Sequence, residues 1–222
     1  MQVAAKFGHP ANVAEARAIQ ERLRASLVLA DRIGPIRRIA GVDVGFHRAR
    51  NLLRASVVVM DFPDLVLRDA AVAEAPPVFP YVPGYLSFRE VPVILEAFGA
   101  LGTKPDLLMV DGHGIAHPRR LGIASHLGLV LDLPSIGVAK SRLCGTFEEP
   151  GASAGDVSAL TDRGETIGVV LRSRVRANPL FISSGHRVSL KTAQRLVEQC
   201  LNRFRLPEPT RVADQMSKFP RR

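Results

Sequence analysis

The sequence has 222 residues, of which 46% are hydrophobic and 23% charged, a composition typical of a globular protein with a sizeable core. Its formal net charge of +9 favours a polyanionic partner, either nucleic acid or an anionic membrane surface. Two cysteines are too few for a disulfide framework or a cysteine zinc site. The sequence has no apolar run long enough for a membrane-spanning helix and no apolar N-terminal segment typical of a secretion signal. We therefore expect a cytoplasmic protein.

A packing helix is predicted over residues 12–28, where Asn12 and Glu15 have capping-box spacing. The first strand is predicted over residues 38–46, and one of its two alternating sets of side chains contains Asp43 between glycines. A lone carboxylate in such a strand is costly to bury unless it is paired or binds a metal. Asp43 is therefore a candidate metal ligand, and a hydrogen-bonded structural aspartate is the alternative.

Two further strands are predicted over residues 52–62 and 65–75. The turn between them, Asp61–Asp64, contains a proline and indicates an antiparallel hairpin. The first three strands should then form a meander.

A stiff, irregular loop is predicted over residues 76–86, which are rich in proline. This loop holds both tyrosines of the chain, and the chain has no tryptophan. An aromatic side chain on a proline-stiffened loop suits insertion beside or between nucleic-acid bases. The alternative is a loop that packs on its own core.

Ser87 and Glu90 have capping-box spacing at the start of a helix that is predicted to reach Leu101. A cap is by itself a sufficient structural explanation for Glu90. A carboxylate in the first turn of a helix can also project toward a neighbouring site, and its companions decide between these two interpretations.

The stretch over residues 107–110 is uniformly apolar and ends at Asp111, which indicates a strand that is buried on both faces. Ligand crevices of open α/β sheets lie outside the carboxyl ends of the strands, so Asp111 lies where a site is expected. Gly112 and Gly114 would let a substrate approach the backbone closely.

A helix over residues 118–131 and a strand over residues 134–139 complete a predicted βαβ unit with parallel strands. Lys140 should emerge at the same sheet edge as Asp111, where its ammonium can pair with phosphate. His113 and His117 have the i, i+4 spacing of a zinc site. Gly114 and Pro118 argue against a helix that holds both, and further ligands are missing, so zinc is disfavoured.

The C-terminal third is predicted to contain an exposed, mobile loop (145–165), a closing strand pair (166–172 and 179–183), a helix capped by Ser189 that reaches about residue 204, and a tail that starts as a proline turn and ends basic. Alternation places Arg172, Arg174 and Arg176 on one side of the chain. With no internal repeat or linker, we expect a single domain over residues 1–222 with its core at about 36–204.

The predicted elements are, in order, a meander, a helix, a strand, a helix and a strand, with acids at Asp43, Glu90 and Asp111. This is the layout of an α/β ribonuclease H-like fold, in which a central mixed sheet has helices on both faces. Carboxylate oxygens suit Mg²⁺ or Mn²⁺, which also bind phosphate oxygens. Without a cation, repulsion among three acids would raise at least one of their pKa values. The sequence therefore predicts a site for a divalent metal.

Four segments resemble the endonuclease V family, and the likeness covers about residues 12–215. They are 39–44, 80–90, 111–114 with the stretch that leads to Lys140, and 207–211. Residues 80–90, which join the proline-rich loop to the Ser87–Glu90 spacing, are the most specific of the four.

The resemblance implies a DNA repair endonuclease that binds deoxyinosine and hydrolyses the second phosphodiester bond on its 3′ side, leaving a 3′-hydroxyl and a 5′-phosphate. It also implies Mg²⁺ as cofactor, with Mn²⁺ as a substitute. By position, the catalytic residues would be Asp43, Glu90, Asp111, Lys140 and Asp214, and the first three of these would hold the metal. The wedge that fills the gap left by the flipped base would be Pro80, Tyr81, Val82 and Pro83. The inosine pocket would be lined by Gly84, Leu86, Gly112, His117, Ile123 and Leu143.

Two other functions compete with this interpretation. Another ribonuclease H-like nuclease, such as a junction resolvase or ribonuclease H, would not need the Pro-Tyr-Val-Pro-Gly wedge. A non-catalytic nucleic-acid-binding protein is disfavoured because the three acids and Lys140 are intact. We expect a monomer with a nucleic-acid partner and no membrane, and because some family members prefer inosine in RNA, both DNA and RNA are possible substrates.

Overall fold

The structure is a computed structural model that describes residues 8–219. The N-terminal residues 1–7, where we expected no secretion signal, and residues 220–222, the end of the tail that we expected to be basic, lie outside this range. No helix within it is long and apolar enough to cross a membrane. In chain order the elements are α2 (Val13–Arg24), β1 (Arg38–His47), η1 (Arg48–Arg50), β2 (Leu52–Asp61), β3 (Leu67–Ala75), α3 (Leu86–Gly99), β4 (Leu107–Val110), α4 (Ile123–Leu131), β5 (Ser135–Ala139), β6 (Val157–Asp162), β7 (Glu165–Leu171), β8 (Leu180–His186), α5 (Leu190–Gln199) and α6 (Glu208–Ser217).

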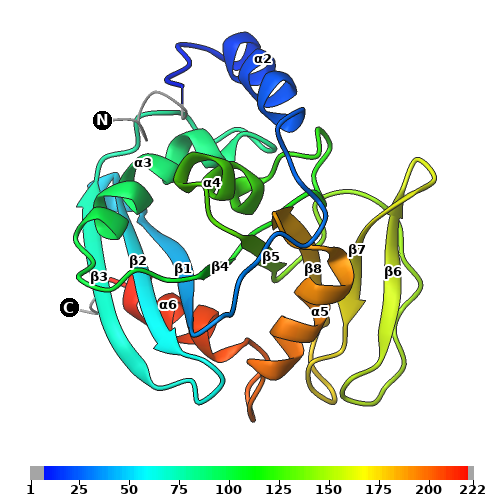
Figure 1. Cartoon of the computed structure of the whole chain (residues 1–222). Coiled ribbons are helices and arrows are strands. Elements are labelled where there is room, and N and C mark those ends of the chain that lie inside the picture. Colours follow the sequence, from blue (N-terminus) through cyan, green and yellow to red (C-terminus); the bar gives the residue numbers. More distant parts are fainter. Residues whose placement is uncertain (1–7, 220–222) are drawn as a thin grey trace.

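One eight-stranded sheet, with strand order β3-β2-β1-β4-β5-β8-β7-β6, runs through the molecule (Figure 1). The strands β1, β2 and β3 form the predicted antiparallel meander. The strands β1, β4 and β5 are parallel neighbours at the centre, as the predicted βαβ unit requires. The carboxyl ends of β1, β4 and β5 therefore meet at one edge of the sheet.

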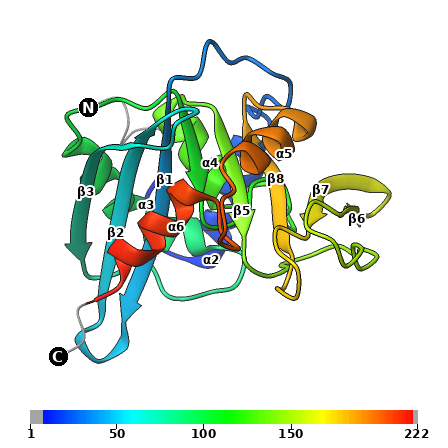
Figure 2. The ribbon, with the colours of Figure 1, turned by 90° about the horizontal axis from the view of Figure 1, so that it is seen from below.

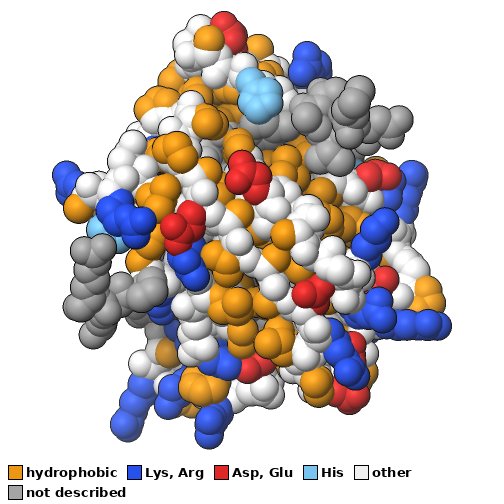
Figure 3. All heavy atoms as spheres, turned by 90° about the vertical axis from the view of Figure 1, so that its left-hand side faces the viewer, with side chains coloured by type: hydrophobic (Ala, Val, Ile, Leu, Met, Phe, Trp, Pro, Cys, Tyr) orange, Lys and Arg blue, Asp and Glu red, His pale blue; other side chains and the backbone are white. Residues whose placement is uncertain are grey.

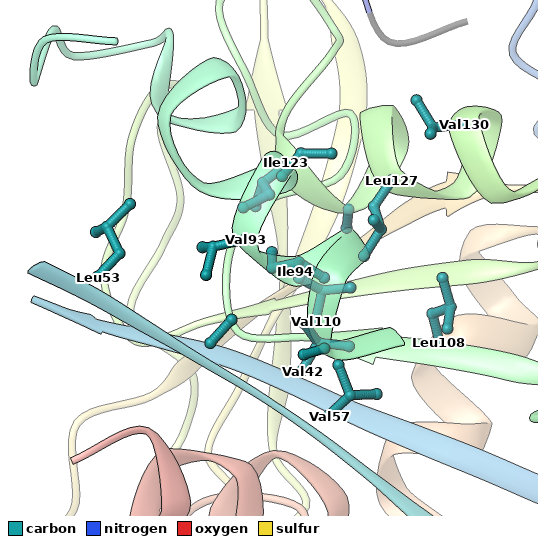
Figure 4. Packing of buried hydrophobic residues seen from close by; sticks show 14 of the residues in the cluster. Val42, Leu53, Val57, Val93, Ile94, Leu108, Val110, Ile123, Leu127 and Val130 are labelled. Atoms are coloured by element: carbon teal, nitrogen blue, oxygen red, sulfur yellow. The ribbon is translucent and has the colours of Figure 1, made fainter. Parts of the chain in front are cut away.

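Helices α3 and α4 cover one face of the sheet, above it in Figure 1. The apolar side chains of this face, among them Val42, Val57 and Val110, pack against Ile94 and Leu127 of the two helices (Figure 4). Removing this area from water stabilises the fold at roughly 25 cal/mol per Å² of apolar surface. The packing fixes where α3 begins, next to the sheet edge.

Helices α5 and α6 cover the opposite face, as the view from below shows (Figure 2). Helix α6 was missed by the sequence analysis, which predicted a proline turn and a basic tail. Pro207 and Pro209 in fact start this helix, at positions where the missing N–H would be unpaired in any case. The helix lies across β1 and β2, where Ser56 Oγ donates a hydrogen bond to the Ala213 carbonyl at 2.7 Å.

The glycines beside Asp43 permit this close approach. A Cβ on Gly41 would lie 2.0 Å from the Pro209 carbonyl oxygen, and one on Gly45 would lie 2.3 Å from the Ser217 carbonyl oxygen. Only glycine leaves room there for a helix backbone on the strand. The face of β1 that carries Asp43, Gly41 and Gly45 is thus the face on which α6 packs.

Two predicted helices, those over residues 12–28 and 118–131, have wrong boundaries. Helix α2 ends at Arg24 instead of residue 28, because Val28 pairs with Arg187, whose N–H donates to the Val28 carbonyl at 2.6 Å. Helix α4 begins at Ile123 instead of residue 118. The residues before it fold back, and Gly122 N–H donates to the Gly114 carbonyl at 2.9 Å.

Three C-terminal predictions are also wrong. The stretch predicted as a mobile loop contains β6, which pairs with β7 through a tight turn whose central residues, Arg163 and Gly164, both have positive φ. Arg172, Arg174 and Arg176 do not share one side, because β7 ends at Leu171 and the Arg172 guanidinium turns to the Glu149 carboxylate at 2.6 Å. Helix α5 begins after the predicted Ser189 cap but ends at Gln199, five residues early.

Candidate active site

Asp43 and Asp111 lie side by side at the edge of the parallel strands. Val42 of β1 is in register with Val110 of β4, and the next N–H, that of Asp111, donates to the Val42 carbonyl at 2.9 Å. Helix α6 adds Asp214 from the other face. One oxygen from each of these three carboxylates lies within 4.8 Å of the other two, and we call the three residues the acid cluster.

Two lysines surround the acid cluster, together with Ser217, whose hydroxyl bonds to the Asp43 carboxylate. Lys140, which follows β5, forms ion pairs with Asp111 and with Asp214, the latter at 2.5 Å. Lys218 also pairs with Asp214 at 2.5 Å. Burial lowers the pKa of Lys140, but the carboxylates of Asp111, Asp214 and Asp43 together outweigh this effect, so the net shift is upward and the lysine stays charged.

Glu90 lies beside the acid cluster but outside the group of three. Burial raises its pKa to about 8, and the negative charge of Asp43 raises it in the same direction. Burial, then Asp43, likewise raises the pKa of Asp111 to about 7. These shifts are those expected of buried carboxylates that also repel one another.

The predicted capping role of Glu90 is wrong. Helix α3 begins at Leu86, its N-cap is Tyr85, and no side chain caps it. Ser87 lies inside the first turn, where its hydroxyl bonds to His126 Nδ1 at 2.9 Å. The structural explanation for Glu90 therefore fails, and its position beside Asp43 and Asp111 remains.

The donor atoms of the acid cluster fit a hard divalent cation. All are carboxylate oxygens, which suit Mg²⁺ or Mn²⁺, and the Asp43 and Asp111 carboxylates repel one another, a repulsion that a bound cation would offset. Among residues 8–219 no group of three potential metal ligands includes His113 or His117. His117 instead bonds to the Gly84 carbonyl.

A cavity of about 220 Å³ opens directly next to the acid cluster. Gly112, the residue after Asp111, is part of its wall. All six residues predicted for the inosine pocket line it, and so do three of the four predicted wedge residues: Tyr81, Val82, Pro83, Gly84, Leu86, Gly112, His117, Ile123 and Leu143. Pro80 does not line the cavity, whereas His113, to which we gave no role, does.

The two tyrosines of the proline-rich loop have opposite environments. Tyr81 is 71% exposed at the rim of the cavity, so its ring is available to a ligand. Tyr85 is 8% exposed, and the Arg119 guanidinium lies 4.1 Å from its ring centroid. Tyr85 thus follows the alternative of a loop that packs on its own core, whereas insertion of Tyr81 beside or between bases stays a prediction.

The turn that carries the wedge is pinned at Gly84, whose φ of +80° suits the third position of a turn with Pro83 before it. The Gly84 carbonyl accepts hydrogen bonds from Gln20 Nε2 at 3.0 Å, His117 Nε2 at 2.9 Å and Arg119 Nη2 at 2.6 Å. His117 Nδ1 accepts from the Arg119 N–H, which leaves its hydrogen on Nε2, and burial lowers the pKa of this histidine to about 4. Three donors on one carbonyl fix the cavity wall.

Sequence reasoning missed Gln20, Arg119 and Ser217. Gln20 lies in the predicted packing helix and is fully buried, yet a glutamine on an apolar helix face gives no sign of its partner. Ser217 lies in the helix that was missed. The one available signal was the spacing of Gly41 and Gly45 around Asp43, which indicates that another backbone packs on the strand.

Comparison with known proteins identifies close relatives. The sequence model of the family described as Endonuclease V matches residues 21–215. The endonuclease V of Nostoc punctiforme is 52% identical over 209 residues, which are 94% of this chain and 95% of that protein. The crystal structure of endonuclease V from Streptomyces avermitilis matches with a TM-score of 0.89 and 42% identity, covering 95% of this chain and 93% of that one. These matches confirm the predicted ribonuclease H-like fold.

A third match was solved with a ligand. The structure of endonuclease V from Ciona intestinalis, in complex with a 24mer DNA that contains an inosine followed by a ribo-adenosine, matches with a TM-score of 0.79 and 27% identity. The match covers 92% of this chain and 95% of that one.

Proposed function

We propose that this chain, which belongs to the endonuclease V family, cuts DNA at the second phosphodiester bond 3′ to a deoxyinosine and leaves a 3′-hydroxyl and a 5′-phosphate. The family membership makes it an inosine-specific DNA repair endonuclease that cleaves 3′ of the lesion. The identity of the bond, the cofactor and the role of each residue are the parts that we infer.

The observation that carries the proposal is the junction between the cavity and the acid cluster. Asp111 belongs to the cluster and Gly112 to the cavity wall. When a base occupies the cavity, the adjoining sugar-phosphate backbone therefore lies near the carboxylates. A nuclease that ignored the base would not need a cavity there. This arrangement favours an inosine-directed nuclease over a junction resolvase or a ribonuclease H.

Asp43, Asp111 and Asp214 would hold Mg²⁺, with Mn²⁺ as a substitute, and Glu90 would assist from α3. Such a cation, when bound, activates water as a nucleophile and neutralises charge on the leaving oxygen. Lys140 would hold a positive charge next to the scissile phosphate. Its ion pairs with Asp111 and Asp214 support this role, because they keep the ammonium at the cluster.

The wedge and the cavity would select the lesion. A mispaired inosine costs less to flip out of the duplex than a well-paired base, which gives part of the selectivity. Tyr81 would stack in the gap that the flipped base leaves, with Pro80, Val82 and Pro83 supporting it. The walls at Gly84 and Gly112 would present backbone groups to the edge of hypoxanthine, and Leu86, His117, Ile123 and Leu143 would enclose it.

The charge of the chain supports nucleic acid as the partner. Lysine and arginine side chains gather around the rim of the face shown in Figure 3. With a net charge of +9, affinity for the phosphate backbone should fall steeply as salt rises. The Ciona intestinalis complex supports inosine-containing DNA as the ligand, and we propose that the chain acts on it as a monomer.

The test is cleavage of a labelled duplex that contains one deoxyinosine, with and without Mg²⁺, beside an adenosine duplex and an inosine-containing RNA. We expect one nick, at the second bond 3′ to the lesion, that Asp43→Ala and Asp111→Ala abolish. The control Asp132→Ala removes an aspartate that pairs with Arg187 at the end of α4, and it should cut normally. Equal cutting of the adenosine duplex would contradict the proposal, and cutting of RNA alone would reassign the substrate.

A further inference from the structure

The turn between β1 and β2 extends past the acid cluster. Strand β1 continues for four residues beyond Asp43, to His47, which is about 13 Å at 3.3 Å per residue. The one-turn helix η1 and Asn51 then reverse the chain into β2. We call residues 47–51 the arm.

The arm carries positive charge without acidic partners. No aspartate or glutamate occurs between Asp43 and Asp61, whereas Arg48, Arg50 and Arg54 all do. Arg48 and Arg50 are exposed, and in the described part of the chain no carboxylate lies within ion-pair distance of either. Arg54 differs, because its guanidinium forms an ion pair with the Glu74 carboxylate at 2.5 Å. Two exposed guanidinia in a rigid turn suit phosphate groups.

The arm has a defined shape. His47 Nδ1 accepts a hydrogen bond from the Arg50 N–H at 3.3 Å, and Asn51 has the left-handed conformation that closes the turn. The Phe219 ring packs edge-on against the His47 ring, with centroids 5.1 Å apart, and the Arg50 guanidinium lies 5.9 Å from its centre. These contacts hold the two arginines at the end of the strand.

Phe219 connects the arm to the acid cluster. It lies two residues after Ser217, whose hydroxyl bonds to the Asp43 carboxylate, and one residue after Lys218, which pairs with Asp214. Figure 2 shows the end of α6 beside this hairpin. The arm is thus continuous with the catalytic carboxylates through a short, packed segment.

Along the strand order, the arm and the part of the cavity wall that follows β4 and β5 lie on opposite sides of the acid cluster. The order β2-β1-β4-β5 has the arm at β2 and β1, and it has the cavity-lining residues Gly112 and Leu143 after β4 and β5. The carboxylates of Asp43 and Asp111 lie between. A strand that has its lesion in the cavity and its scissile bond at the carboxylates continues toward the arm with its 3′ side.

We propose that the arm binds the DNA backbone on the 3′ side of the cut, with Arg48 and Arg50 contacting two phosphates of the strand that leaves with the 5′-phosphate. This inference rests on the proposed function, because the polarity comes from a cut 3′ to the lesion. It assigns a task to charges that the catalytic site does not use.

The test compares Arg48→Ala/Arg50→Ala with wild-type protein on two deoxyinosine duplexes. One has a long 3′ flank, and the other ends just past the cut. We expect affinity for the long duplex to fall roughly tenfold, with a salt slope shallower by about 2, as for two lost phosphate contacts. Affinity for the truncated duplex should be unchanged. The control Arg37→Ala/Arg38→Ala removes two exposed arginines from the opposite end of β1 and should alter neither duplex.

An equal loss on both duplexes, or no loss on either, would overturn the proposal. Thermal unfolding of both double variants checks that the fold is intact. If wild-type protein fails to nick deoxyinosine, the proposed function fails. The dependence of affinity on the 3′ flank is measured by binding alone and so judges the arm separately.

Discussion

The Ser217 hydroxyl donates a hydrogen bond to the Asp43 carboxylate and ties the last turn of α6 to the middle of β1. Ser217 is 2% exposed, and its hydroxyl also lies 3.1 Å from the Asp214 carbonyl oxygen. The contact orients one Asp43 oxygen and holds the segment that carries Asp214. A residue near the end of the chain thereby sets the geometry of a carboxylate in the first strand.

Replacing Ser217 with alanine should weaken metal binding more than catalysis. Outer partners of metal-binding carboxylates typically contribute about 10-fold or more to metal affinity. We therefore expect Ser217→Ala to raise the Mg²⁺ concentration for half-maximal cleavage about 10-fold, with a smaller change at saturating Mg²⁺. The control is Ser125→Ala, because this buried hydroxyl has no hydrogen-bond partner among the residues described. A Mg²⁺ titration that matches wild type would refute the role of Ser217.

Adding one methyl group at Gly41 should detach α6. The new Cβ would lie 2.0 Å from a backbone oxygen that cannot rotate away, so the helix must shift. We expect Gly41→Ala to destabilise the protein by roughly 1–3 kcal/mol and to abolish most cleavage, since Asp214 and Ser217 move with α6. Gly34→Ala adds the same methyl group where nothing lies within 4 Å and should be neutral. Thermal unfolding and cleavage assays measure both effects, and normal activity of Gly41→Ala would contradict the prediction.

Local patterns were sufficient for the parts of the site that lie on strands and strand ends. Asp43 stood out because alternation set it among glycines, and Asp111 because an apolar run ended there. The sheet order follows from the same strands and the short connections between them. Two of the three acids in the cluster were therefore predictable before any tertiary contact was known.

The third acid was not predictable from local pattern, because tertiary packing decides it. Pro207 and Pro209 give the tail the appearance of a turn, yet both prolines are tolerated at the start of α6. Asp214 was assigned only through the family resemblance. The capping-box spacing misled for the same reason, since the buried contact of Ser87 with His126 outweighs a cap.

Loss of the Gln20 amide should loosen the cavity and leave the metal site alone. Gln20 donates to the Gly84 carbonyl and accepts from Arg119 Nε at 2.5 Å, so one substitution affects two contacts. A buried hydrogen bond contributes about 1 kcal/mol, so we expect Gln20→Met to lower kcat/KM for deoxyinosine substrates roughly 5-fold. The Mg²⁺ dependence should stay the same.

Gln194→Met is the matched control, since the Gln194 amide donates to Glu198 in an exposed hydrogen bond on α5. A shift in Mg²⁺ dependence in Gln20→Met would show that Gln20 acts on the acid cluster instead. An unchanged kcat/KM would show that two donors are enough to fix Gly84.

The raised pKa values of Glu90 and Asp111, about 8 and about 7, predict how the metal-free protein responds to pH. The folded protein binds these two protons more tightly than the unfolded chain does, so their contribution to stability falls as pH rises from about 4 to about 8. Glu90→Gln removes one of the two ionisations. Its melting temperature relative to wild type should therefore increase between about pH 4 and about pH 8 in the absence of Mg²⁺.

Mg²⁺ should reduce this difference, because a cation at the acid cluster offsets the repulsion that raises the pKa of Glu90. Contributions from other titrating groups, such as the buried His113 and His117, are common to both proteins and cancel in the comparison. Glu96→Gln, a substitution further along α3, is the control and should show no response to Mg²⁺. If the melting temperatures of Glu90→Gln and wild type keep a constant difference across this range, Glu90 is not a repelled carboxylate, and its place beside the metal site is wrong.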